Sequence, residues 1–184
     1  MVRGYFGIGV EGISKAMNLG SLLRSSHAFG ASFFFTVAAE CAIRDSGKSD
    51  TSEAERNMPL YTFPDVASLL LPKGCQMVAV EIVDDAVLLP SFHHPRCAAY
   101  LFGPERGGLS APMLERCTHR IRIPTRFSVN VGIAAAIVMY DRLLSLGRFA
   151  RRAEMPGGPR ESIPECVFGA PRFRRRRNPP TEAV

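Results

Sequence analysis

The chain has 184 residues, 46% of them hydrophobic, which is enough to bury the core of one ordinary domain. Lys and Arg number 23 against 17 Asp and Glu, and the formal net charge of +6 favours a polyanionic partner. No apolar run approaches the roughly 18 residues of a membrane span, and the glycine-rich start is interpreted as a strand and not as a signal peptide.

The first part of the chain predicts two strands around a short helix. Residues 5–10 are apolar and predict a strand. Asn18 is a good N-cap residue for a helix over residues 19–29, and Gly30 is a typical stop. Residues 32–37 are aromatic and β-branched, which favours a buried strand.

The middle of the chain predicts a loop, a helix and two further strands. Residues 41–57 are polar and predict a mobile loop. Pro64 in a first-turn position predicts a helix that continues to Leu71. Residues 76–82 and 98–102 are apolar and predict strands.

The last predicted elements are a helix, a strand and a long apolar helix. Ser110 and Pro112 open a helix that ends near Cys117, and the strand 120–123 follows and is ended by Pro124.

The long helix begins near Ser128 or Asn130 and stops at Gly147. Residues 131–140 carry no charged side chain, so we expect the fold, a partner subunit or both to cover this helix.

Strands that alternate with helices predict an α/β domain with a mainly parallel sheet, over residues 1–150. Ligands of such sheets bind beyond the carboxyl ends of strands. Residues 151–184 predict a Pro/Gly/Arg-rich tail, and residues 142–184 hold 10 Arg and 4 Glu (10 − 4 = 6), which is the whole net charge. The preference for Arg over Lys favours RNA or another polyanion, although a GC-rich genome would produce it equally well.

Five cysteines lie without a C-x-x-C pattern, which predicts reduced thiols in a cytoplasmic protein and no metal. His93 and His94 are interpreted as part of a surface loop and not as metal ligands.

Three polar motifs fall at strand ends or helix starts. Asn18-Leu19-Gly20 is followed by Arg24, Leu101–Leu109 reads LFGPERGGL, and Ser128-Val129-Asn130 follows the strand at 120–123. Each has a plain structural alternative: a capped helix with a solvated arginine, a glycine turn that contains an acid, and a pair of N-cap residues. Neither a Walker loop nor a G-x-G-x-x-G pattern is present in the sequence.

In this order the three motifs closely resemble those of the SpoU (TrmH-like) RNA ribose methyltransferases of the SPOUT superfamily, over about Tyr5 to Leu146. Val129 stands where leucine is usual. The resemblance implies a C-terminal deep trefoil knot, a rare feature in proteins, S-adenosyl-L-methionine as cofactor, no metal, and a homodimer with the site at its interface.

The resemblance also implies residue roles. Arg24 matches the catalytic arginine, which Asn18, Ser128 and Asn130 would orient together with the substrate, and Glu105 would hold the glycine turn in shape. The residues expected around the cofactor are Val80, Gly103, Ile121, Ile123 and Val129. Beyond Arg24, the residues expected to contact RNA come from their charge: Arg126, Arg174, Arg175, Arg176 and Arg177.

The function that follows is methyl transfer from S-adenosylmethionine to a ribose 2′-hydroxyl of RNA. We expect tRNA, because the sequence shows little beyond the methyltransferase domain; ribosomal RNA is the alternative substrate. A protein of another class, a non-catalytic RNA-binding protein that keeps the knotted fold, is the alternative function.

Overall fold

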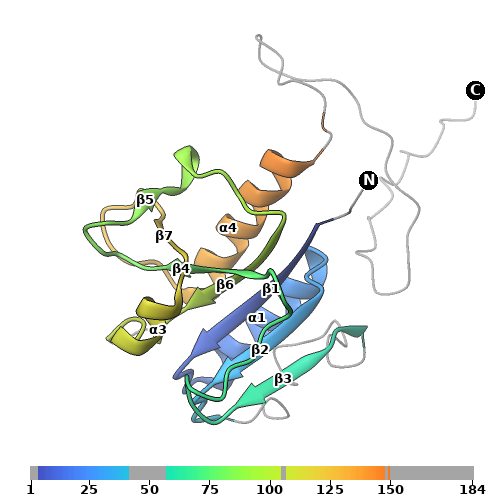
Figure 1. Ribbon diagram of the computed structural model, residues 1–184, viewed down its shortest axis with the longest axis vertical. Coiled ribbons are helices and arrows are strands. Elements are labelled where there is room, and N and C mark those ends of the chain that lie inside the picture. Colours follow the sequence, from blue (N-terminus) through green and yellow to red (C-terminus); the bar gives the residue numbers. More distant parts are fainter. Residues whose placement is uncertain (1–3, 42–56, 105–106, 148, 150–184) are drawn as a thin grey trace, which may run out of the picture. The chain divides into compact units, whose positions relative to one another are not determined.

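The computed structural model describes residues 4–41, 57–104, 107–147 and 149 (Figure 1). Residues Met1–Phe149 form one compact unit. Most of the predicted loop at 41–57 and the whole predicted tail at 151–184 lie outside the described residues, so the boundary at residue 150 stays a prediction.

Seven strands form one sheet in the order β3-β2-β1-β6-β4-β7-β5, and every described pair is parallel, which confirms the predicted α/β class. Their bounds are β1 Tyr5–Glu11, β2 Phe33–Val37, β3 Leu60–Phe63, β4 Gln76–Val80, β5 Val87–Leu88, β6 Cys97–Phe102 and β7 His119–Arg122. A short 3-10 helix, η2 (Leu89–Ser91), follows β5.

Alternate side chains of the strands lie in two separate cores, because successive residues of a strand point to opposite faces. Phe34 and Tyr100 lie in the first core, and Phe35 and Leu101 lie in the second. Helices α1 (Ala16–Ala28) and α4 (Val131–Leu146) pack on the first face, and α3 (Ala111–Arg116) packs on the second through Met113. Buried on both faces, β2 and β6 read as continuous apolar runs in the sequence.

The start of α1 differs from the prediction. The helix begins at Ala16, its N-cap residue is Lys15, and no side chain caps it there. Asn18 therefore lies in the first turn of the helix, where its side chain is 7% exposed. The predicted cap at Asn18 is wrong because its amide oxygen accepts a hydrogen bond from Nδ2 of Asn130, across to α4.

The predicted helix over 64–71 is also wrong, and turns occupy this segment instead. The backbone N–H of Ser68 donates to Oδ1 of Asp65 at 2.7 Å, a local side-chain bond that competes with helical bonding. Arg116 then donates to the carbonyls of Val66 and Leu69, so these acceptors are satisfied without a helix. Two short edge strands, β3 and β5, were not predicted at all.

The two later helices begin as predicted. Ser110 caps α3 and accepts a hydrogen bond from the N–H of Met113, and Asn130 caps α4 and accepts one from Gly132 at 2.9 Å. Gly147 is the C-cap of α4. None of the helices in the described ranges has the length and apolarity that crossing a bilayer requires.

The fold covers only part of the apolar helix α4. One stripe of side chains is buried against the sheet and α1: Val131, Ala135, Val138, Met139 and Arg142. On the other side, Ile133 is 55% exposed and Tyr140 is 51% exposed. Burial in the core therefore explains the absence of charge over 131–140 on only one side of α4. The other side is equally uncharged although it is exposed.

Candidate functional site

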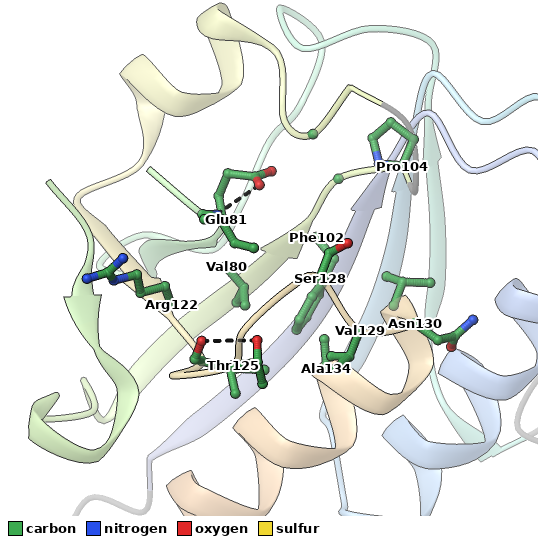
Figure 2. A pocket seen from close by; sticks show the side chains of 15 residues that line it. Val80, Glu81, Phe102, Pro104, Arg122, Thr125, Ser128, Val129, Asn130 and Ala134 are labelled. Atoms are coloured by element: carbon green, nitrogen blue, oxygen red, sulfur yellow. Dashed lines mark hydrogen bonds between the residues drawn. The ribbon is translucent and has the colours of Figure 1, made fainter. Parts of the chain in front are cut away.

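A pocket of about 410 Å³ lies at the carboxyl ends of β4, β6 and β7, which is where a parallel sheet is expected to bind ligands. Figure 2 shows Val80 and Glu81 at the end of β4, Phe102 at the end of β6, and Val129 and Ala134 at the start of α4, arranged around this pocket. The remaining lining residues are Ile82, Gly103, Pro104, Gly108, Arg122, Ile123, Thr125, Ser128, Asn130 and Val131.

The glycine turn after β6 forms one wall of the pocket. A Cβ atom on Gly103 would lie 2.5 Å from the carbonyl carbon of Gly108 and 2.5 Å from the nitrogen of Leu109, so the two ends of the turn touch. Gly108 has a φ of +70°, a backbone conformation that glycine adopts without strain. The second motif therefore needs glycine at Gly103 for close approach and at Gly108 for conformation.

Two carboxylates hold this turn, and sequence reasoning missed both. Oε2 of Glu81 accepts a hydrogen bond from the N–H of Leu109 at 2.8 Å, and its Oε1 accepts one from Ile82 at 2.9 Å. Glu11, at the end of β1, is 7% exposed and accepts hydrogen bonds from the N–H of Ser110 at 2.9 Å and from its hydroxyl at 2.6 Å. Hydrogen bonds to carboxylate acceptors are the stronger kind, so the far end of the turn, at Leu109 and Ser110, is well fixed.

Glu105, which was predicted to hold the turn, lies outside the described residues. The signal that could have identified Glu81 and Glu11 is their position, since each is an acidic residue at the carboxyl end of an apolar strand that enters the sheet.

The third motif joins the pocket to the start of α4. Ser128 is exposed and lines the pocket, and Asn130 caps α4. Asn130 also donates its Nδ2 hydrogen bond to Oδ1 of Asn18 at 3.1 Å, so the first and third motifs meet although 112 residues separate these two residues.

Four of the five residues expected around the cofactor line this pocket: Val80, Gly103, Ile123 and Val129. The fifth, Ile121, is fully buried in the first core, and its carbonyl accepts a hydrogen bond from the N–H of Glu81. Ile121 therefore supports the pocket wall from behind and does not line it.

The predicted arginines lie elsewhere. Arg24, on α1, and Arg126, in the loop before α4, are exposed and do not line the pocket. The tail arginines Arg174, Arg175, Arg176 and Arg177 are outside the described residues.

A second, apolar groove runs between α1 and α4. Ser21 and Ser25 of α1 line it together with Phe29, the C-cap residue of that helix, and from α4 it is lined by Ile133, Ala136, Ile137 and Tyr140. Asn130 lines both this groove and the pocket, so whatever covers the groove also lies next to the pocket.

A buried polar cluster lies at the amino ends of β1 and β6, away from the pocket. Nδ1 of His94 is 2.6 Å from the hydroxyl of Tyr100, and its Nε2 is 2.9 Å from Oδ2 of Asp141. Arg142 donates to the carbonyls of Pro95 and Arg96 and lies over the ring of Phe6. Burial lowers the pKa of His94, and the neighbouring Asp141 only partly offsets this, so the ring is neutral at pH 7.

This histidine cluster joins a hydroxyl, an imidazole and a carboxylate but has no access to a substrate, because Tyr100 is fully buried and His94 is 1% exposed. His94 is therefore not the surface-loop residue that the sequence predicts. We assign the cluster a packing role, in which it joins α4 to the amino ends of the strands.

The pocket suits a neutral or weakly charged organic ligand. Its wall is formed by aliphatic side chains and by the backbone of the glycine turn, with one acidic side chain, Glu81, and one basic side chain, Arg122, among the described lining residues. Within the same ranges, no group of three or more His, Cys, Asp or Glu side chains is placed to hold a metal.

Known proteins share both the sequence pattern and the fold. The chain is 29% identical over 143 residues to an uncharacterized tRNA/rRNA methyltransferase of Synechocystis, with 73% of this chain and 52% of that protein covered. It is 27% identical to the tRNA (guanosine(18)-2′-O)-methyltransferase of Thermus thermophilus, with 72% of this chain and 71% of that protein covered. The AdoMet-bound rRNA methyltransferase from Sinorhizobium meliloti has a similar fold, with a TM-score of 0.70 at 21% identity, over 79% of this chain and 58% of that one.

The chain spans only about half the length of the Synechocystis relative, 52% of it. The family assignment does not depend on that share, because residues 6–140 match the family model, and this range contains all three motifs, the pocket and the capped start of α4. The chain therefore belongs to the SpoU rRNA Methylase family.

Proposed function

We propose that the protein transfers a methyl group from S-adenosylmethionine to a ribose 2′-hydroxyl of RNA. The observation that carries the proposal is the pocket itself, which the second and third motifs of the family build together at the carboxyl ends of β4, β6 and β7. Relatives named for 2′-O-methylation of tRNA and of ribosomal RNA support the same reaction.

The described residues fit this cofactor. A volume of about 410 Å³ is within the usual range of small-molecule sites, roughly 300–1,000 Å³. Val80, Ile123 and Val129 offer an aliphatic surface to an adenine ring, and the turn at Gly103 and Gly108 brings backbone close to the ligand. When bound, the cofactor supplies an electrophilic methyl group.

Arg24 has the chemistry that the substrate needs. A guanidinium remains protonated at any working pH, so it is a poor base but a permanent cation. It would stabilise the negative charge that develops as the ribose oxygen passes its proton to a phosphate of the RNA or to water. Asn18 and Asn130, joined by their hydrogen bond, fix the first turn of the helix that carries Arg24 against the edge of the pocket. Ser128 lines that edge with an exposed side chain. For Glu105 we propose the role expected from the sequence, which is to hold the glycine turn in shape.

A second copy of this chain is the proposed occupant of the groove between α1 and α4. Arg24 lies on α1 outside the pocket of its own chain, while Asn130 lines both the groove and the pocket. A homodimer across the groove would bury the exposed faces of Ile133 and Tyr140 and would bring one protomer's α1 near its partner's pocket.

The dimer is tested by light scattering on the wild type and on Ile133→Asp. We expect the wild type to be a dimer and Ile133→Asp to be a monomer with little turnover. Val87→Asp, at a residue 46% exposed on β5 outside the groove, is the matched control and should remain dimeric. A wild-type monomer that methylates RNA would refute this part of the proposal.

We favour tRNA over ribosomal RNA as the substrate, since the Thermus thermophilus relative, of which 71% is covered, is named for tRNA. The tail with Arg174–Arg177 would add phosphate contacts, so deleting residues 154–184 should weaken RNA binding and flatten its salt dependence. The family's trefoil knot is proposed for the segment that ends in α4, and the chain path in a crystal structure would test it.

The decisive experiment compares Arg24→Ala with Arg96→Ala, an exposed arginine just before the amino end of β6, which is the opposite end of the strand from the pocket. Methyl transfer to tRNA and to ribosomal RNA is followed by mass spectrometry of the nucleosides. We expect Arg24→Ala to lose turnover by a factor of 100 or more (about 3 kcal/mol at the transition state) while it still binds S-adenosylmethionine. Arg96→Ala should remain active. A wild type that binds RNA and methylates neither substrate would favour a non-catalytic RNA-binding protein.

A further inference from the structure

The pocket carries two charged side chains whose purpose the reaction does not explain. Among the described lining residues, Glu81 is the acidic one and Arg122 the basic one. The proposed cofactor carries a positive charge on its sulfur before methyl transfer, and the product, S-adenosylhomocysteine, carries none. A fixed charge in the pocket wall therefore acts differently on the two ligands.

Glu81 is held in place more firmly than a surface carboxylate. Its two oxygens accept hydrogen bonds from the N–H groups of Ile82 and Leu109, at 2.9 and 2.8 Å. The carboxylate also packs directly on the turn, since a Cβ atom on Gly108 would lie 2.6 Å from Oε2. An ionised carboxylate offers about four acceptor positions, so about two remain after these bonds.

Arg122 belongs to the end of β7 and is exposed, so solvent screens its charge more than that of the half-buried Glu81. The net electrostatic effect of the wall is then set by Glu81. Figure 2 shows the two side chains on the same side of the pocket, with Glu81 next to the glycine turn and Arg122 farther from it.

Resting on the proposed function, we propose that Glu81 is a ligand-selectivity residue of the pocket, whose carboxylate fixes the glycine turn and favours the cationic S-adenosylmethionine over the neutral S-adenosylhomocysteine. Selectivity of this kind is useful because the product must leave before the next cofactor binds. The chemical class that the residue recognises is a sulfonium cation attached to a nucleoside.

Glu11 provides the matched control for the structural part of this role. It holds the same turn through Ser110, with both of its oxygens, but it does not line the pocket. A change at Glu11 should disturb the wall without changing the charge that faces the ligand. Comparing variants of Glu11 and Glu81 therefore distinguishes the role of holding the turn from the role of selecting the ligand.

The experiment measures the Kd of S-adenosylmethionine and of S-adenosylhomocysteine by calorimetry for the wild type, Glu81→Gln, Glu11→Gln and Arg122→Gln. Glutamine keeps the shape of glutamate and one acceptor oxygen but removes the charge. We expect Glu81→Gln to shift the ratio of the two Kd values by roughly threefold towards the product, the size expected for one partly screened charge. Arg122→Gln should shift the ratio the opposite way. Glu11→Gln should raise both Kd values by a common factor and leave their ratio unchanged.

The outcomes separate this inference from the proposed function. If the wild type binds both ligands and methylates RNA, but Glu81→Gln leaves the ratio unchanged, the selectivity role is wrong and the methyltransferase stands. The role is equally wrong if Glu81→Gln and Arg122→Gln shift the ratio in the same direction. A wild type that binds neither ligand overturns the proposed function and this inference together. Thermal unfolding of each variant checks that the fold is intact.

Discussion

Gly103→Ala tests whether the closed glycine turn is what shapes the pocket. The added Cβ would lie 2.5 Å from the carbonyl carbon of Gly108 and from the nitrogen of Leu109, whereas ordinary contacts begin at 3.4 Å. The far end of the turn must therefore move by about 0.9 Å (3.4 − 2.5). A shift of this size directed away from Glu81 would stretch the 2.8 Å bond from Leu109 to about 3.7 Å (2.8 + 0.9), beyond hydrogen-bond range.

The expected cost combines two effects. Overpacking costs roughly 1–3 kcal/mol, and loss of a hydrogen bond to a charged group costs roughly 1.5–3 kcal/mol. Because moving the turn relieves the overpacking but breaks the hydrogen bond, the two costs are not fully additive. We expect a loss of about 2–4 kcal/mol in the free energy of unfolding. Urea unfolding measures this loss, and calorimetry should show that affinity for S-adenosylmethionine falls at least tenfold.

Gly74→Ala is the matched control for this prediction. Gly74 has a φ of +81° and no atom within 4 Å of an added Cβ. Alanine there should therefore lower the free energy of unfolding through backbone strain alone, by about 1–2 kcal/mol. It lies before β4, outside the pocket, and should leave ligand affinity unchanged. A Gly103→Ala protein with the stability and affinity of the wild type would refute the reasoning about the turn.

Three further predictions concern stability. Arg142→Met leaves the partly buried carbonyls of Pro95 and Arg96 without their donor, so the free energy of unfolding in urea should fall by about 3 kcal/mol, and a change below about 1 kcal/mol would contradict the assigned packing role. Burial lowers the pKa of His94, so below about pH 6.5, the ordinary pKa of histidine, the unfolded chain binds more protons than the folded one. The free energy of unfolding in urea should therefore decline as the pH falls from about 7.5 to about 5, and His94→Gln should flatten this pH dependence. Ser110→Ala removes both the cap of α3 and the hydroxyl hydrogen bond to Glu11, which together should cost roughly 2–4 kcal/mol in urea unfolding, and an unchanged midpoint would show that neither bond is needed.

Local signals in the sequence predicted the elements whose stability is local. Apolar runs identified β1, β2, β4 and β6, and the cap residues Ser110 and Asn130 placed the starts of α3 and α4 correctly. The same kind of signal failed at Asn18 and at residues 64–71, where partners far along the chain decide the structure. Asn18 binds Asn130, and Arg116 satisfies the carbonyls of the 64–71 turns.

The candidate site shows the same division. The three motifs identified Gly103, Ser128 and Asn130, because glycine turns and helix caps have a recognisable local pattern. Glu11 and Glu81 bind residues 99 and 28 positions away, and no spacing in the sequence reports such a pair. Nor could the sequence tell which side of α4 faces the core, since both sides are equally apolar over residues 131–140.

The central strand pair has a consequence for how the protein is made. β1 pairs with β6 in a register that joins Tyr5 to Cys97, so 92 residues (97 − 5) must be added before that edge of β1 has its partner. At about 5–20 residues per second, the ribosome needs roughly 5–20 s for this stretch, far longer than the microseconds of hairpin formation. During that time an apolar strand with one open edge is exposed to other nascent chains. We expect ribosome-bound chains that end before β6 to be cut by protease within β1 and β2, and chains that extend beyond α4 to resist; early resistance would show that β1 and β2 are protected without β6.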